Sequence, residues 1–191
     1  MDSMGGRDVD RAVDEMVQVL GPHGGAHWQA RAGSLEWSCR QTATHVAHDL
    51  LAYAGQLAAR PAHAYLPFDL AVDDGAPVRE VLEVVNACGR LLAAALAAAA
   101  PGDRAWHFGP CDPTGFAAMG VAETLLHTHD ITQGLGIAWH PPQDLCTAVL
   151  ERLLPDAPAG DPAQVLLWST GRGDLPGRPH ITSWVWNAAP P

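Results

Sequence analysis

The sequence contains no lysine, and its basic side chains are eleven arginines scattered singly along 191 residues. Acidic residues outnumber them, so the formal net charge is −10 at pH 7. A nucleic-acid surface needs clustered basic side chains, because these displace counterions from the phosphates. The absence of such a cluster excludes a nucleic-acid partner.

Long hydrophobic runs are also missing. The most apolar window, Leu91 to Ala100, is ten residues long, which is half of what a membrane-spanning helix requires. The first sixteen residues are acidic and contain no apolar run, unlike a secretory signal peptide. We therefore expect a soluble, cytoplasmic protein with no membrane partner.

Cysteine is scarce, and the four cysteines contain no C-x-x-C pair. Such spacing is unlike that of a structural zinc site. We expect reduced and mostly buried thiols, with Cys111 a loop thiol rather than a nucleophile.

Helical periodicity dominates what the sequence does contain. With 48% hydrophobic and 17% charged residues, the chain is long enough to bury a core as one globular domain. The apolar spacing, a Ser38–Gln41 capping box and an Asp112–Pro113 start signal indicate helices. The predicted helices are Val9–Leu20, Ser38–Ala59, Val78–Ala100, Asp112 to the glycines 134 and 136, and Pro141–Leu154.

The tail has a different composition. Residues 163–170 and 180–187 are rich in branched and aromatic side chains, and a Gly/Pro-rich stretch separates them. This pattern predicts two antiparallel strands joined by a long loop. The expected fold is mainly α, a four-helix bundle over residues 1–155 with a small C-terminal antiparallel β appendage over 156–191, packed on the same domain.

Two predicted helices carry polar side chains on one face. Glu123, His127 and Asp130 are spaced by four and three residues, and His45 shares a face with His48 and Asp49. Facing helices of a bundle can aim such groups at one point. A divalent ion bound by His45, Glu123 and His127 would keep an open coordination position, as catalytic zinc sites do. The alternative is a solvated polar face with a hydrogen-bonded core histidine.

The same residues carry a family resemblance. The stretch LEWSCRQTATHVAHDLLAYAGQLAAR resembles a helix of the mycothiol-dependent maleylpyruvate isomerase N-terminal-domain family. In that family a metal-binding histidine follows a tryptophan by eight residues. His45 follows Trp37 at the same distance here. AETLLHTHDITQGLG resembles the second family motif, Glu-x-x-x-His-x-x-Asp. The resemblance covers residues 9–136 well and the tail weakly, through LLWSTGR. His48 departs from the motif and is an alternative ligand or a supporting donor.

The resemblance implies a DinB-like bundle that binds zinc or another divalent metal and uses a low-molecular-weight thiol such as mycothiol. Zinc would hold that thiol as the nucleophilic thiolate, in an isomerase or an S-transferase acting on a small electrophile. The isomerase itself is longer, with a C-terminal domain that helps to grip its substrate, so maleylpyruvate is not expected as the substrate here.

Further side chains have candidate roles around this site. Asp130 is a candidate acceptor for the ligand His127, with a backbone carbonyl as its rival. An anionic thiol or carboxylate substrate needs a cationic clamp, for which Arg172, Arg178 and Arg90 are candidates. Asp130 and Arg172 are thus the catalytic candidates, and Arg90 and Arg178 the cofactor-binding ones.

Other functions stay open at this point. The same metal could activate water in a hydrolase, or the bundle could bind a metal or small ligand without catalysis. Two imidazoles and a carboxylate also suit iron or nickel. The oligomeric state is open, with a homodimer as one option.

Overall fold

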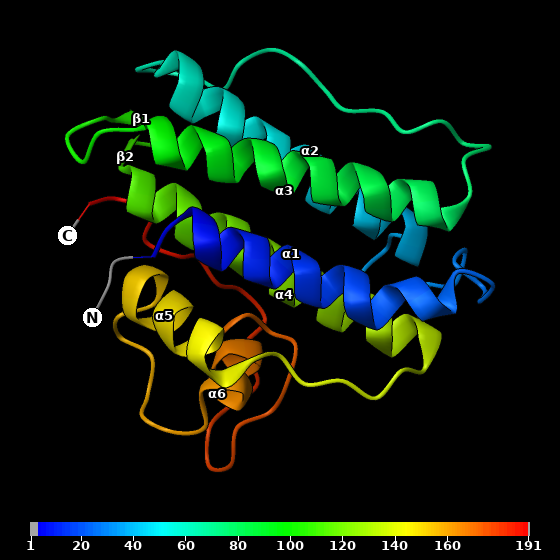
Figure 1. The fold of residues 1–191 in the computed structure, drawn as a ribbon. Helices are drawn as coiled ribbons and strands as arrows, with labels where there is room; N and C mark the ends of the chain where they lie inside the picture. The colour runs from blue at the N-terminus through cyan, green and yellow to red at the C-terminus, as the bar shows by residue number, and fades with distance from the viewer. Residues whose placement is uncertain (1–3, 191) are drawn as a thin grey trace.

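Four long helices run side by side and form a bundle in the computed structural model, which describes residues 4–190 (Figure 1). They are α1 (Gly6–Leu20), α2 (Cys39–Ala59), α3 (Val78–Ala98) and α4 (Pro113–Leu135). Their main contacts are α2 with α3, α2 with α4, α1 with α3, and α1 with α4. The ring order is therefore α1–α3–α2–α4, which makes α2 and α4 direct neighbours.

The ends of α2 and α4 follow the signals in the sequence. The Ser38 hydroxyl accepts from the Gln41 amide at 3.2 Å, and the Gln41 side chain accepts from the Ser38 amide at 2.9 Å, which completes the capping box. The Asp112 carboxylate accepts from the Gly115 amide at 2.8 Å ahead of α4. Gly136 ends α4 with φ of 68°, a left-handed conformation that suits glycine.

Helix α4 lies at the centre of the hydrophobic core. It is covered by α1, α2 and α5 (Gln143–Leu153), so side chains around most of its circumference are buried. Phe116, Met119 and Leu125 of α4 are among the largest fully buried side chains, together with Leu50 of α2. Polar side chains on such a helix are held in fixed positions by the packing around them.

A two-stranded antiparallel sheet lies at one end of the bundle. It consists of β1 (Ala105–Trp106) and β2 (Pro110–Cys111), paired Ala105 with Cys111 and Trp106 with Pro110. The Trp106 amide donates to the Pro61 carbonyl at 2.8 Å, so this hairpin is tied to the end of α2. Phe108 in its turn has φ of 52° and is 82% exposed.

The mainly helical fold with a small antiparallel sheet is confirmed, but the position predicted for the strands is wrong. Residues 163–170 lie almost wholly in helix α6 (Pro162–Ser169), whose first turn is capped by the Asp161 carboxylate accepting from the Gln164 amide at 2.9 Å. Residues 180–187 contain no strand, because a helix cannot serve as their pairing partner. The observed sheet, residues 105–111, was not predicted.

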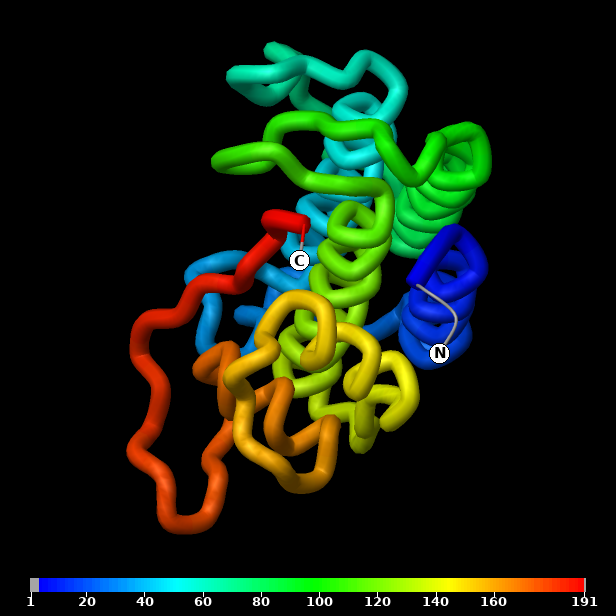
Figure 2. Tube along the Cα trace, turned by 90° about the vertical axis from the view of Figure 1, so that its left-hand side faces the viewer, coloured from blue at the N-terminus to red at the C-terminus, as the bar shows by residue number. Residues whose placement is uncertain are grey.

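The tail after α6 nevertheless returns to the bundle. Helix α6 packs on α5, which packs on α4. The chain then loops outward and comes back toward the start of α4 (Figure 2), where the Asn187 amide donates to the Leu153 carbonyl at 2.8 Å. This return places residues 184–189 beside the hairpin. The division into residues 1–155 and 156–191 stays a prediction.

Within the described residues, α3 is the one helix that is long and apolar enough to cross a membrane by length and composition alone. Core helices share these properties, and α3 packs its buried face against α1 and α2. A cytoplasmic location stays an expectation.

Candidate metal centre

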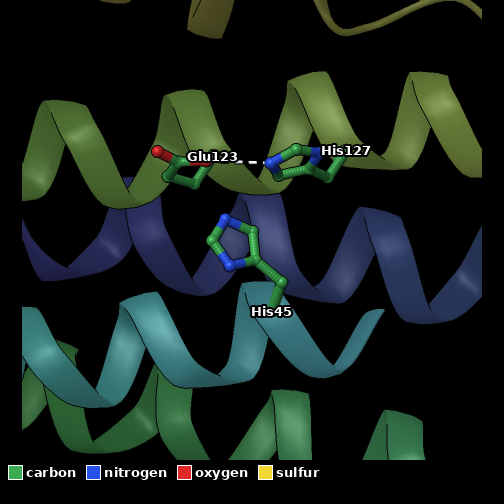
Figure 3. A group of neighbouring side chains, drawn as sticks. All are labelled: His45, Glu123 and His127. Atoms are coloured by element: carbon green, nitrogen blue, oxygen red, sulfur yellow. Dashed lines mark ion pairs between the residues drawn. The ribbon is translucent and has the colours of Figure 1, made fainter. Parts of the chain in front are cut away.

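Three side chains from α2 and α4 converge between the two helices. Glu123 and His127 lie one turn apart on α4, and His45 points from α2 toward the space between them (Figure 3). Each can offer one metal-ligating atom, and these atoms lie within 4.8 Å of one another. We call His45, Glu123 and His127 the triad. Its geometry brings two imidazoles and a carboxylate around one point.

Both ring nitrogens of His127 face carboxylates. Nε2 lies 3.1 Å from Glu123 Oε2, and Nδ1 lies 3.0 Å from Asp130 Oδ2. Burial by itself lowers the pKa of His127, but its hydrogen bonds to Asp130 and Glu123 outweigh burial and raise the pKa to about 9. Burial likewise raises the pKa of Glu123, and the hydrogen bond and charge of His127 reverse this shift and hold it below its ordinary value. Without a metal, the pair is therefore an ion pair.

Asp130 is fixed by an arginine from the tail. The Arg172 Nε lies 3.1 Å from each Asp130 carboxylate oxygen, and Nη2 lies 2.9 Å from Oδ2. Asp130 is buried, and the Arg172 side chain is 10% exposed. Burial by itself raises the pKa of Asp130. The hydrogen bond from His127 and the charge of Arg172 outweigh burial and hold the pKa below its ordinary value, so the carboxylate stays ionised. Arg172 thus holds Asp130, and Asp130 holds the ring of His127.

The third member of the triad, His45, has neighbours on α2 and in the segment just before it. His45 Nε2 lies 3.2 Å from Asp49 Oδ2, and the Trp37 ring lies 4.6 Å from the imidazole. Burial, together with the Glu123 charge, raises the pKa of Asp49 to about 8. The sequence placed Asp49 on the face of His45 and Trp37 eight residues before it, but gave neither side chain a role in this site. Asp49 lies one turn beyond His45 on α2, whereas Trp37 precedes the Ser38 cap and contacts His45 from outside the helix.

The triad fits a divalent metal. Two imidazoles and a carboxylate are a usual donor set for zinc, and three protein ligands are the number that catalytic zinc sites provide. Histidine ligands normally donate their second N–H to a carboxylate, which is the arrangement of His127 and Asp130. All four cysteines are buried and free, and none belongs to the triad.

The remaining candidates lie elsewhere. Arg90 pairs with Asp10 and Asp14 of α1, each at 3.0 Å. The Arg178 guanidinium lies over the Trp168 ring, 5.7 Å from its centroid. Within residues 4–190, neither arginine contacts the triad. Their roles in binding a cofactor stay predictions.

Two further groups singled out in the sequence also lie outside the triad. His48 Nδ1 lies 2.9 Å from Asp69 Oδ1, in the segment that follows α2. The Cys111 thiol is buried in strand β2, and burial raises its pKa to about 12. A thiol in that state is a poor nucleophile at neutral pH.

The sequence of this protein matches a known protein family. The family described as the mycothiol maleylpyruvate isomerase N-terminal domain matches residues 7–132, which span α1 to most of α4 and include the whole triad. No curated protein and no solved structure matches the chain. The match covers well over half of the 191 residues. The chain therefore belongs to the mycothiol maleylpyruvate isomerase N-terminal domain family.

Proposed function

We propose that this protein is a zinc-dependent enzyme that uses a low-molecular-weight thiol, such as mycothiol, as an isomerase or S-transferase acting on a small electrophile. The observation that carries the proposal is the convergence of His45, Glu123 and His127 within 4.8 Å in a chain of this family. The family name supports the thiol, and the donor set supports the metal.

The three protein donors would hold the metal and leave a position for the thiol sulfur. When bound, zinc supplies a Lewis acid that keeps the thiol in its thiolate form at neutral pH. The side chains of this protein do the rest of the positioning. Glu123 and His127 sit on a rigid buried helix, and Asp130 holds the His127 ring so that Nε2 faces the triad.

Other residues control charge and water at the site. Trp37 lies against the His45 ring and covers that side of the triad, which limits the access of water. Arg172 neutralises Asp130, so the negative charge that faces the metal is mainly that of Glu123. Two neutral imidazoles and one carboxylate leave a zinc site with net positive charge, which favours an anionic thiolate ligand.

Metal content and cobalt spectroscopy test this proposal. His45→Ala, Glu123→Ala and His127→Ala should each lose most of the zinc that the natural protein retains after dialysis. In cobalt-substituted protein, mycothiol should shift the visible absorption and add a sulfur-to-cobalt band. Full zinc content in all three variants would overturn the site. Zinc binding with no response to mycothiol would overturn the thiol chemistry, and hydrolysis of ester probes would then favour the hydrolase.

A further inference from the structure

A cavity of about 550 Å³ lies beside the triad and includes Glu123 in its wall. Its other walls come from Tyr53 of α2, the β1–β2 hairpin and the returning tail over residues 184–189. Tyr53 follows His45 by two helical turns on the same side of α2. The cavity therefore lies next to the triad. A substrate that reacts with a thiol held at the triad would have to bind in such a position.

Five aromatic rings line the cavity. Tyr53, His107, Phe108, Trp184 and Trp186 all line it. The centroids of Tyr53 and His107 are 6.1 Å apart, and those of Trp184 and Trp186 are 5.3 Å apart. His107 is fixed from two sides, because its Nδ1 bonds to the Tyr65 hydroxyl and its Nε2 accepts from the Trp186 indole at 3.5 Å. A cavity lined by these fixed rings favours flat, apolar molecules.

The charges in and around the cavity disfavour anions. Glu123 is the only charged side chain among the lining residues in the described part of the chain. The Arg172 guanidinium lies over the Trp184 ring, 5.9 Å from its centroid, but it is occupied by Asp130. An anion in this cavity would find no free guanidinium to pair with it, because the charges nearby are already paired, Glu123 with His127 and Arg172 with Asp130.

Arg152 approaches from another side and is also occupied. It donates to the Asp112 carboxylate at 2.8 Å and to the carbonyl oxygens of Asn187 and Ala188, both at 3.1 Å. Its charge is therefore used to tie the tail to the start of α4.

We propose that this cavity binds an uncharged aromatic electrophile, whose oxygen substituent accepts a hydrogen bond from the Tyr53 hydroxyl. The inference rests on the proposed function and names the substrate class. It separates this protein from an enzyme acting on maleylpyruvate, which carries two carboxylates. The Tyr53 hydroxyl has no hydrogen-bond partner of its own within residues 4–190, so it is available to a ligand. Exposed Phe108 and Val185 form an apolar rim at the entrance.

A matched pair of unreactive probes tests the charge preference. Methyl 3,5-dinitrobenzoate and 3,5-dinitrobenzoate have the same ring and differ by one negative charge. Calorimetric titration of the full chain, metal-free and without thiol, should show the ester binding about tenfold more tightly, because the carboxylate would lose water without gaining a cation to pair with. Equal or tighter binding of the carboxylate would overturn the proposal, as would failure of the ester to bind. The titration is then repeated with zinc. Carboxylate binding that is seen only with zinc reflects coordination to the metal, whereas binding seen in both titrations is to the cavity wall.

Variants place the binding in this cavity. Tyr53→Phe should weaken the ester about three- to tenfold, the effect of one hydrogen bond. Val185→Arg, at a position 83% exposed and therefore safe for folding, should strengthen carboxylate binding about fivefold or more, since it adds the missing cation. Leu91→Arg on α3, 52% exposed and outside the cavity wall, is the matched control and should change nothing. An unchanged carboxylate affinity in V185R would show that the ligand binds elsewhere.

These results are independent of the thiol. If the cobalt experiment fails but the ester still binds in the cavity, the proposed function is wrong and the binding site stands. If mycothiol responds while the ester does not bind, the proposed function stands and the assigned substrate class is wrong.

Discussion

The His127 imidazole is held at both nitrogens, and this arrangement has consequences at the scale of single residues. Asp130→Asn keeps the shape of the side chain but removes the charge that faces His127 Nδ1. A carboxylate partner fixes the tautomer and raises the basicity of a ligand histidine, and its loss typically costs about 10–100-fold in metal affinity. We expect D130N to bind zinc about 10–100-fold more weakly in a competition titration with a chromophoric chelator.

Asp112→Asn is the control for this change. Asp112 forms a comparable ion pair with Arg152 at 2.8 Å, away from the triad. Asparagine also caps helices well, so D112N should lose the ion pair while keeping its zinc affinity. The role assigned to Asp130 is wrong if both variants bind zinc within about twofold of the natural protein, well short of the expected loss.

The raised pKa of His127 predicts proton release on metal binding. With a pKa of about 9 in the metal-free protein, the imidazole is mostly protonated at pH 8, whereas an ordinary histidine is mostly neutral there. A metal ligand must be neutral, so zinc binding at pH 8 should release about one proton. Calorimetry in two buffers of different ionisation enthalpy measures this number. A release near zero would mean that His127 is already neutral.

The same proton affects folding stability with a definite sign. A pKa raised on folding stabilises the folded state below the unfolded value, which is about 6.5. That contribution is lost as the pH rises from there through about 9. The metal-free protein should therefore become less stable over this interval, and His127→Gln should flatten the decline in denaturant titrations.

At the scale of elements, local start signals were better guides than residue composition. The capping box at Ser38 and the Asp–Pro pair at 112 and 113 predicted where α2 and α4 begin. The same Asp–Pro signal at 161 and 162 starts α6, but branched and aromatic residues over 163–170 suggested a strand. A short apolar run cannot be assigned by periodicity alone. The Asp161 cap was the deciding evidence, and it was present in the sequence.

The approach of α4 to the start of α2 depends on Gly134. A Cβ at this position would collide with the Arg31 carbonyl oxygen and, at 2.6 Å, with the Cys39 sulfur. Gly134→Ala should therefore push the two helices apart, cost about 1–3 kcal/mol of stability and weaken zinc binding. Gly21→Ala is the control, since its φ is −54° and nothing lies within 4 Å of the added Cβ. Equal stability of both variants in urea would refute this close-packing argument.

At the scale of the whole molecule, the sequence predicted residues that lie on periodic elements and missed those that reach the site from elsewhere. His45, Glu123 and His127 could be placed on facing helices because a bundle aligns such faces. The cavity wall could not be predicted, because Trp184 and Trp186 belong to an irregular segment. The path of such a segment is set by tertiary contacts, here the bond from the Asn187 amide to the Leu153 carbonyl.

A metal held by α2 and α4 should stabilise the entire bundle, because it joins two helices distant in sequence. Zinc at about a hundredfold excess over its dissociation constant should add about 2.7 kcal/mol to the unfolding free energy, or about 5–10 °C in Tm for a chain of this size. His45→Ala should abolish this increase in a thermal scan with and without zinc. His48→Ala, on the same helix but directed toward Asp69, should retain it. Equal zinc-dependent increases in both variants would show that the metal binds somewhere other than between α2 and α4.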